Sequence, residues 1–157
     1  MATKKKEVTV TNVVLDKADM RVKLKGDDKM FVPQAKTDGA AGLDLVLAND
    51  VVLREGEVQK VGTGVHVEIP VGHVGLVFLR SSISDVTMTN GVGVIDSDYR
   101  GEIILKLRGV SRYSRYTAGD RVAQLVVMKY LPVNVIVSDQ LSSTERGEGG
   151  FGSTGKC

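Results

Sequence analysis

Residues 65–70 read Val65-His66-Val67-Glu68-Ile69-Pro70, and this stretch determines the fold class. Three apolar side chains alternate with two polar ones, which is the period of a β-strand with one buried face and one solvated face. Proline then ends the run, because it has no N–H to donate to a neighbouring strand. The pattern predicts a half-buried strand rather than a helix.

The same period recurs outward along nearly the whole chain. Further β-rich segments lie at residues 8–13, 22–24, 76–79, 103–107, 122–128 and 133–137. Clusters of turn-forming residues separate them, as at Asn49-Asp50, Gly62, Gly72 and residues 118–120. We expect at most one short helix. Many short strands separated by turns predict an all-β chain, folded as a jelly roll or a β-barrel-like structure that protects its sheet edges.

The composition indicates one domain with an apolar core. The chain has 157 residues, of which 42% are hydrophobic and 25% charged, so it is not disordered by composition. The formal net charge is only +2, which argues against a basic nucleic-acid binder. We interpret the short basic run at residues 4–6 as a solvated tail.

Cysteine and histidine are too few to build a disulfide scaffold or a zinc site. Cys157 is the single cysteine, and His66 and His73 are the two histidines. No apolar run reaches the length of a membrane span, and no signal peptide follows the N-terminal lysines. We therefore expect an intracellular protein without membrane or nucleic-acid partners. The expected location is the cytoplasm, or the nucleus if the source is eukaryotic or viral.

The last 17 residues differ from the rest of the chain. They are rich in glycine and lack β-branched aliphatic residues, so we expect residues 1–140 to form the core and residues 141–157 a flexible arm. Residues 150–156 resemble a phosphate-binding P-loop, but Cys157 follows the lysine, and neither the Mg²⁺-binding hydroxyl nor a helix comes next. We reject that motif. The glycines, Arg146 and Ser153 can still bind an anion, and a plain flexible tail is the alternative.

Residues 90–101 hold the first candidate for catalysis. Turn-forming residues flank a short apolar centre, which predicts a hairpin. Asp96 follows that centre directly, and a carboxylate at the edge of a core is a candidate general base. On spacing alone, a turn aspartate bonded to its own backbone is the more common reading. Tyr99 is equally consistent with a residue that fills the sheet.

Arg80, Ser81 and Ser82 follow a predicted strand and form a candidate phosphate site, since an arginine fork and two hydroxyls suit that ligand. Alone the triplet is weak, and so are residues 41–45 and 119–124, which also suit a turn leading into a strand. Taken together and in order, residues 41–45, 80–82, 93–101, 119–124 and 146–155 resemble the trimeric dUTPase family. The most specific blocks are Gly-Val-Ile-Asp-Ser-Asp-Tyr-Arg-Gly and Arg-Gly-Glu-Gly-Gly-Phe-Gly-Ser-Thr-Gly.

The resemblance implies a jelly-roll homotrimer with active sites at the subunit interfaces, over which the C-terminal arm closes. The implied reaction is Mg²⁺-dependent hydrolysis of dUTP to dUMP and pyrophosphate by attack of water at the α-phosphorus. In the family this activity keeps uracil out of DNA and supplies dUMP.

The resemblance also implies a role for each matched residue. Asp96 orients and deprotonates the attacking water, and Tyr99 lies against the deoxyribose. The backbone from Asn90 to Asp96 presents donors and acceptors to uracil, including Gly93, Val94 and Ile95. The implied phosphate and arm contacts are Arg80, Ser81, Ser82, Gln124, Arg146, Phe151, Gly152 and Ser153, with Arg146 on the γ-phosphate and Phe151 stacked on uracil. No direct protein ligand is implied for Mg²⁺, which the triphosphate and water hold; Asp44 is the carboxylate expected to reach that water shell.

Three departures from the family pattern and two alternatives remain. Leu43 replaces a larger residue and Ser82 a common glycine, and the stretch from Arg80 to Asp96 is slightly short. One alternative is a dCTP deaminase, or a bifunctional deaminase–diphosphatase, of the same fold. The other is a trimer that serves only as a regulatory or scaffold partner.

Overall fold

The computed structural model describes residues 18–26 and 28–150, and within them the all-β prediction is confirmed. The strands are β1 (Arg21–Leu24), β2 (Gly42–Val46), β3 (Val51–Arg54), β4 (Val58–Glu68), β5 (His73–Leu79), β6 (Val86–Met88), β7 (Gly93–Ile95), β8 (Glu102–Gly109), β9 (Tyr113–Tyr116) and β10 (Arg121–Lys129). One short 3₁₀-helix, η1 (Lys29–Phe31), precedes β2. The strand expected at residues 8–13 lies outside the described residues.

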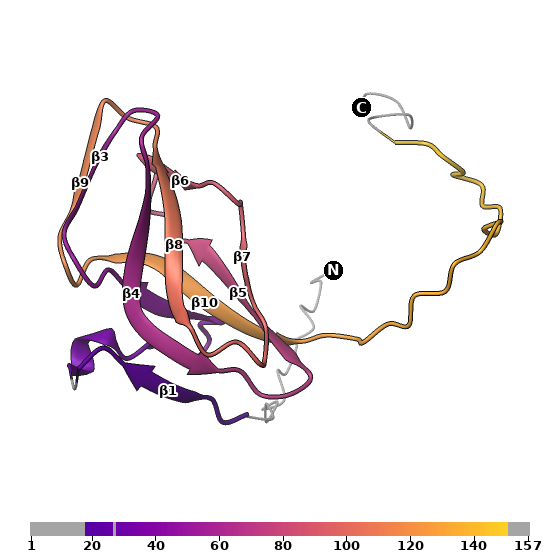
Figure 1. Cartoon of the computed structure of the whole chain (residues 1–157), viewed down its shortest axis with the longest axis horizontal. Coiled ribbons are helices and arrows are strands. Elements are labelled where there is room, and N and C mark those ends of the chain that lie inside the picture. Colours follow the sequence, from indigo (N-terminus) through magenta and orange to yellow (C-terminus); the bar gives the residue numbers. More distant parts are fainter. Residues whose placement is uncertain (1–17, 27, 151–157) are drawn as a thin grey trace, which may run out of the picture.

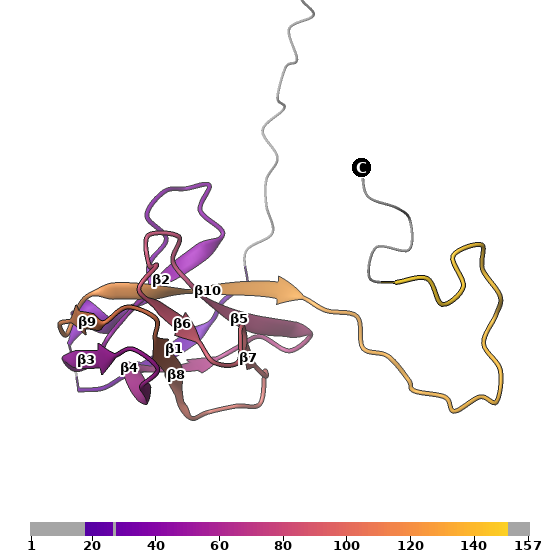
Figure 2. The same cartoon turned by 90° about the horizontal axis from the view of Figure 1, so that it is seen from above.

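Two four-stranded antiparallel sheets enclose the core (Figures 1 and 2). One has the order β1-β4-β8-β6, and the other has the order β2-β10-β5-β7. A two-stranded ribbon of β3 and β9 lies at one end. Neighbours in each sheet are mostly distant in the sequence, which is typical of a jelly roll and brings chemistry-bearing segments from far apart onto one surface.

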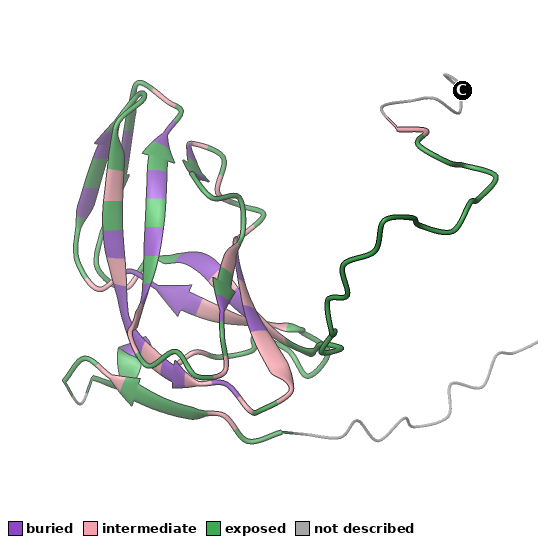
Figure 3. Cartoon of the chain, turned by 45° about the vertical axis from the view of Figure 1, so that its right-hand side comes forward, coloured by how far each residue is buried: buried purple, intermediate pink, exposed green. Residues whose placement is uncertain are grey.

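The core is aliphatic and follows the alternation seen in the sequence. In β8, Ile103, Leu105 and Leu107 are at most 1% exposed, while the residues between them face solvent. Figure 3 shows the same alternation of buried and exposed segments along the strands. Val77 and Leu125 bring the second sheet into this core. Among the described residues, Phe31 is the one aromatic side chain in the buried cluster, as the low aromatic content predicts.

The turn predictions need two corrections. Gly62 does not break a strand but lies inside β4, where the pairing with β8 shifts register between Gly62 and His66. A side chain at Gly62 would collide with the Glu102 carboxylate, so the glycine is there for close packing. Residues 90–101 do not form a hairpin of two strands. They supply one strand, β7, which pairs with β5, because three residues between two turns are too few for two strands.

The chain leaves the sheets after Lys129. Residues 133–137, predicted as β-rich, form no strand in the described chain, and Figures 1 and 2 show this segment extending away from the barrel. Its apolar side chains are exposed: Leu131 by 83%, Ile136 by 85% and Val137 by 94%. Among the described residues, no helix is long and apolar enough to cross a bilayer.

Candidate active site

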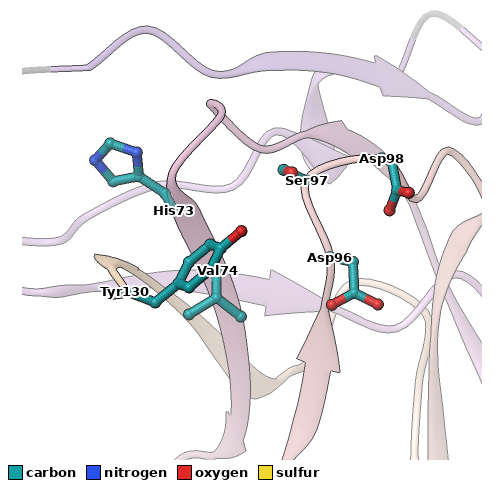
Figure 4. A pocket seen from close by; sticks show the side chains of 6 residues that line it. All are labelled: His73, Val74, Asp96, Ser97, Asp98 and Tyr130. Atoms are coloured by element: carbon teal, nitrogen blue, oxygen red, sulfur yellow. The ribbon is translucent and has the colours of Figure 1, made fainter. Parts of the chain in front are cut away.

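Asp96 lines a pocket of about 610 Å³ at the end of β7. Figure 4 shows its walls: Asp96, Ser97 and Asp98 come from the turn after β7, His73 and Val74 from the neighbouring β5, and Tyr130 from the end of β10. Within the described residues, the Asp96 carboxylate forms no hydrogen bond or ion pair, and only its backbone carbonyl accepts a bond, from the Tyr99 amide. The alternative of a turn aspartate bonded through its side chain is therefore not what the structure shows.

The turn after Asp96 is fixed by its own side chains. The Arg100 guanidinium donates to the Ser97 carbonyl at 2.7 Å and to the Tyr99 carbonyl at 2.9 Å. The Tyr99 hydroxyl donates to the Glu102 carbonyl at 3.0 Å, which holds the ring against Gly101. A Cβ at Gly101 would collide with that ring. Asp96 therefore stands at the start of a braced turn whose outer wall is the partly exposed Tyr99.

The residues before Asp96 alternate as β7 requires. Ile95 is buried in the core, whereas Val94 is 61% exposed, so Val94 and Asp96 lie on the outer face of the sheet. Asn90 closes the preceding turn by donating from Nδ2 to the Val92 carbonyl at 3.2 Å. That turn passes through Gly91, whose φ of 69° favours glycine.

A second pocket of about 390 Å³ collects the candidate phosphate-binding residues. Arg80 and Ser81 line it from the end of β5, Gln124 from β10, and Gly42 and Asp44 from β2. A Cβ at Gly42 would overlap the Gln124 amide, which would then have to move. The residues of three sequence blocks thus meet here. Ser82 follows on the exposed turn and does not line this pocket.

Asp44 lines this pocket and joins two arginines, of which Arg80 also lines it. Its carboxylate lies 3.1 Å from Nε of Arg80 and 3.1 Å from a terminal nitrogen of Arg121, and its side chain is only 12% exposed. The Arg80 amide also donates to the Val122 carbonyl at 3.0 Å. Both oxygens of Asp44 are therefore engaged in fixing guanidinium groups. This preorganises the cationic side of the pocket before any ligand arrives.

The loop that follows Arg80 is fastened at Asp85. The Tyr116 hydroxyl donates to the Asp85 carboxylate, and the Ser114 hydroxyl donates to the Asp85 carbonyl at 2.9 Å. Partial burial raises the pKa of Asp85, but the hydrogen bonds from Tyr116 and Ser114 outweigh it, and the net pKa is lowered. Burial and then the Asp85 carboxylate raise the pKa of Tyr116 far above its usual value. The hydrogen bonds at Asp85 therefore hold this loop in place.

The two pockets share a sheet face but no lining residue. Val94, Leu76, Val126 and Gly42 form one row across β7, β5, β10 and β2. Asp96 lies two residues beyond this row and Gln124 two residues before it. With strands about 4.8 Å apart and a rise of about 3.3 Å per residue, their backbones are about 16 Å apart. The surface between them is apolar and partly exposed, with Val94 at 61% and Met128 at 49%.

The arm residues lie apart from both pockets. Arg146 is exposed in the C-terminal segment, where its Nε donates to the Gly149 carbonyl at 2.9 Å. The segment from residue 130 to 150 leaves the barrel in Figures 1 and 2 and forms no sheet pairing in the described chain. Phe151, Gly152 and Ser153 lie outside the described residues.

Sequence reasoning missed several residues that line or brace the pockets. Tyr130 and His73 line the Asp96 pocket, and Lys36 lines the phosphate pocket. Arg100 belongs to a recognised block, but only the structure shows that it braces the turn. The position of Lys36, a basic residue shortly before the block at residues 41–45, was the one sign in the sequence that it belongs to this pocket.

Comparison with known proteins identifies the family. The family model for dUTPase matches residues 28–155. A deoxyuridine 5'-triphosphate nucleotidohydrolase of Anaeromyxobacter sp. (strain Fw109-5) is 43% identical over 129 residues, covering 80% of this chain and 88% of that protein. The chain belongs to the dUTPase family. The resemblance inferred from the five blocks is confirmed.

Solved dUTPases share the fold. The dUTPase of Streptococcus mutans has a TM-score of 0.68 at 32% identity, over 73% of this chain and 98% of that one. The dUTPase of Staphylococcus bacteriophage 80alpha, solved with dUpNHpp, has a TM-score of 0.80 at 27% identity, over 89% of this chain and all of that one. These relatives carry the dUTPase name, which favours the diphosphatase prediction over the deaminase alternative.

Proposed function

We propose that this protein is a dUTP diphosphatase that hydrolyses dUTP to dUMP and pyrophosphate. Family membership supports the reaction class, and the arrangement of the two pockets supports the assignment of roles. The observation that carries the proposal is a contrast between two groups: the Asp96 carboxylate has no partner among the described residues, whereas Arg80, Ser81 and Gln124 already lie together in one pocket.

The chemical step follows from these groups. Asp96 accepts a proton from the water that attacks the α-phosphorus, so an O–P bond forms and the bond from that phosphorus to the bridging oxygen breaks. The bridging oxygen leaves with the outer two phosphates as pyrophosphate. Arg80 and the donors of Ser81 and Gln124 stabilise the charge that accumulates on the leaving group. A positioned base contributes about 10²–10⁴-fold to the rate.

We propose that the functional unit is a homotrimer in which Asp96 of one copy meets the phosphate pocket of another. The separation of about 16 Å between the two pockets along one sheet supports this arrangement. The apolar outer face around Val94 and Met128 supports it as well, because partly exposed apolar sheets are typical of interfaces. The exposed apolar residues of the segment 131–141 provide further surface that another copy can cover.

Substrate selection is assigned to the braced turn and to the arm. The fixed ring of Tyr99 offers a flat wall to the deoxyribose, and the backbone around β7 offers donors and acceptors to uracil. Residues 141–157 remain the predicted arm, with Arg146 on the γ-phosphate and Phe151 on the base. Closure of such an arm excludes water from the site and makes activity depend on a complete ligand.

Mg²⁺ fits this site as an ion held by the substrate. Within the described residues, no group of three or more histidine, cysteine or acidic side chains could cage a metal, and both oxygens of Asp44 contact arginines. The triphosphate and water are therefore the proposed ligands, with Asp44 reaching only the outer water shell. When bound, the ion neutralises charge on the phosphates.

The test uses the purified protein with Mg²⁺ and dUTP, dCTP, dTTP or UTP, and measures pyrophosphate and ammonia. Pyrophosphate from dUTP alone is the expected result. Ammonia from dCTP would instead support the deaminase alternative. Binding of dUTP without any product would leave a regulatory or scaffold role. Substitution of Asp98 by Asn, beside Asp96 in the same pocket, tests which carboxylate is the base: we expect D98N to retain most of the turnover that D96N loses.

A further inference from the structure

Lys36 lines the pocket of about 390 Å³ that also contains Arg80, Ser81 and Gln124. It precedes β2, and its backbone is held on both sides. An antiparallel bridge joins Gln34 to Asp44, with the Asp44 amide donating to the Gln34 carbonyl at 2.9 Å, and a turn joins Thr37 to Ala40. Lys36 therefore lies on a fixed segment and shares a pocket with the candidate phosphate-binding residues.

Lys36 is exposed, and its positive charge has no neutralising partner among the described residues. Within the described chain, no acidic group lies within ion-pair distance of its ammonium, although Asp38 is only two residues away. Asp44 lies in the same pocket, but its two oxygens already contact Arg80 and Arg121. Arg80 shares the single negative charge of Asp44 with Arg121, so the ammonium of Lys36 adds to a positive electrostatic potential in the pocket. An anionic ligand with several charges is the chemistry that balances it.

We propose that Lys36 is a further substrate-binding residue, whose ammonium contacts the polyphosphate of the nucleotide and favours ligands that carry more phosphates. This rests on the proposed function, since it takes the pocket of Arg80 and Gln124 as the phosphate site. Lysine suits the role because it is a flexible point charge that can follow the phosphates as they bind. Its contribution grows with the charge of the ligand, so it acts on the triphosphate more than on the monophosphate product.

The experiment compares wild type, Lys36→Gln, Lys36→Arg and Lys106→Gln in steady-state hydrolysis of dUTP and in calorimetric binding of dUMP, dUDP and dUpNHpp. Lys106 is the matched control, because it is an exposed lysine on β8 in the opposite sheet. For K36Q we expect KM for dUTP to rise about tenfold, the size of one charged hydrogen bond, with kcat changed less than twofold. Affinity should fall about tenfold for dUpNHpp, less for dUDP and hardly at all for dUMP.

The controls separate this proposal from the proposed function. K106Q should behave as wild type, and K36R should recover most of the affinity because it restores the charge. Unchanged melting temperatures exclude a folding defect as the cause. Equal affinity of K36Q and wild type for dUpNHpp, or an equal loss for dUMP and dUpNHpp, would overturn the role of Lys36. A wild-type protein that releases no pyrophosphate from dUTP would overturn the proposed function instead.

Discussion

The two pockets on the β2-β10-β5-β7 sheet are built in opposite ways. In the phosphate pocket, Asp44 contacts Arg80, which also lines the pocket, at 3.1 Å, so this arginine is fixed before a ligand arrives. In the other pocket, the turn is braced by Arg100, but the Asp96 carboxylate itself has no partner in the described chain. This difference supports the proposal that the first pocket binds phosphate and that Asp96 reacts, because a base that is already hydrogen-bonded is less free to accept a proton.

The largest expected effect comes from removing the Asp96 carboxylate. Asp96→Asn should lower kcat by about 10²–10⁴-fold, because the amide cannot accept a proton from water. The melting temperature should stay within error of wild type, since the side chain makes no bond in the described structure. Single-turnover hydrolysis and thermal melts test both statements. Turnover close to that of wild type would place the base elsewhere.

Removal of the arm should come next in size. Deletion of residues 146–157 should reduce turnover of dUTP at least tenfold, because water is no longer excluded from the closed site. The core should melt at the same temperature, since the described part of this segment makes no sheet contact. A clear drop in the melting temperature of the ligand-free protein would mean that the segment also supports the fold.

Breaking the arginine network should affect binding and stability together. In Asp44→Asn, two guanidinium groups lose their shared carboxylate, and we expect the free energy of unfolding to fall by about 1–3 kcal/mol. KM for dUTP should rise more than kcat falls, because Arg80 is no longer held in place. Chemical denaturation and steady-state kinetics measure the two effects. Unchanged KM and kcat would contradict the role of Asp44 in holding Arg80.

The smallest expected effect comes from losing the hydrogen bond between Tyr116 and Asp85, which holds the loop after Arg80. Tyr116→Phe removes the hydrogen bond to Asp85 and should cost about 1–2 kcal/mol of stability at neutral pH. The folded pKa of Asp85 is lowered, so this stabilisation is present above the ordinary aspartate pKa and is lost as the pH falls through the folded value. Denaturation of both proteins between neutral and acidic pH should show the difference shrinking toward acid. A difference that is constant with pH would contradict the role of the Asp85 charge.

Much of this could be predicted from the sequence, and the failures have physical causes. Alternation located the strands that pack on the core, such as β8, because burial on one face imposes a period of two. The five blocks identified the family and the main candidate residues. The hairpin at residues 90–101 was wrong, because the partner of β7 is β5, which pairing rules within one segment cannot reveal. The strand expected at residues 133–137 pairs with no strand in the described chain.

Contacts between side chains that are far apart in the chain could not be predicted from the sequence either. Asp44 and Arg121 are separated by 77 residues, and Tyr116 and Asp85 by 31, so no spacing rule predicts their contacts. Lys36 enters the phosphate pocket only because the bridge between Gln34 and Asp44 places it there. The flexible-arm assignment of residues 141–157 remains a prediction.

Complementation between two inactive variants tests most directly whether Asp96 of one copy serves the phosphate pocket of another. We expect Asp96→Asn and Arg80→Gln each to lose nearly all turnover of dUTP when purified alone. They are then unfolded together in equal amounts and refolded. If Asp96 of one copy serves the phosphate pocket of another, random assembly gives a site with both groups intact in about one quarter of cases, and about one quarter of wild-type activity should return. If both groups of a site come from one chain, every site carries one defect and the mixture stays as inactive as its components.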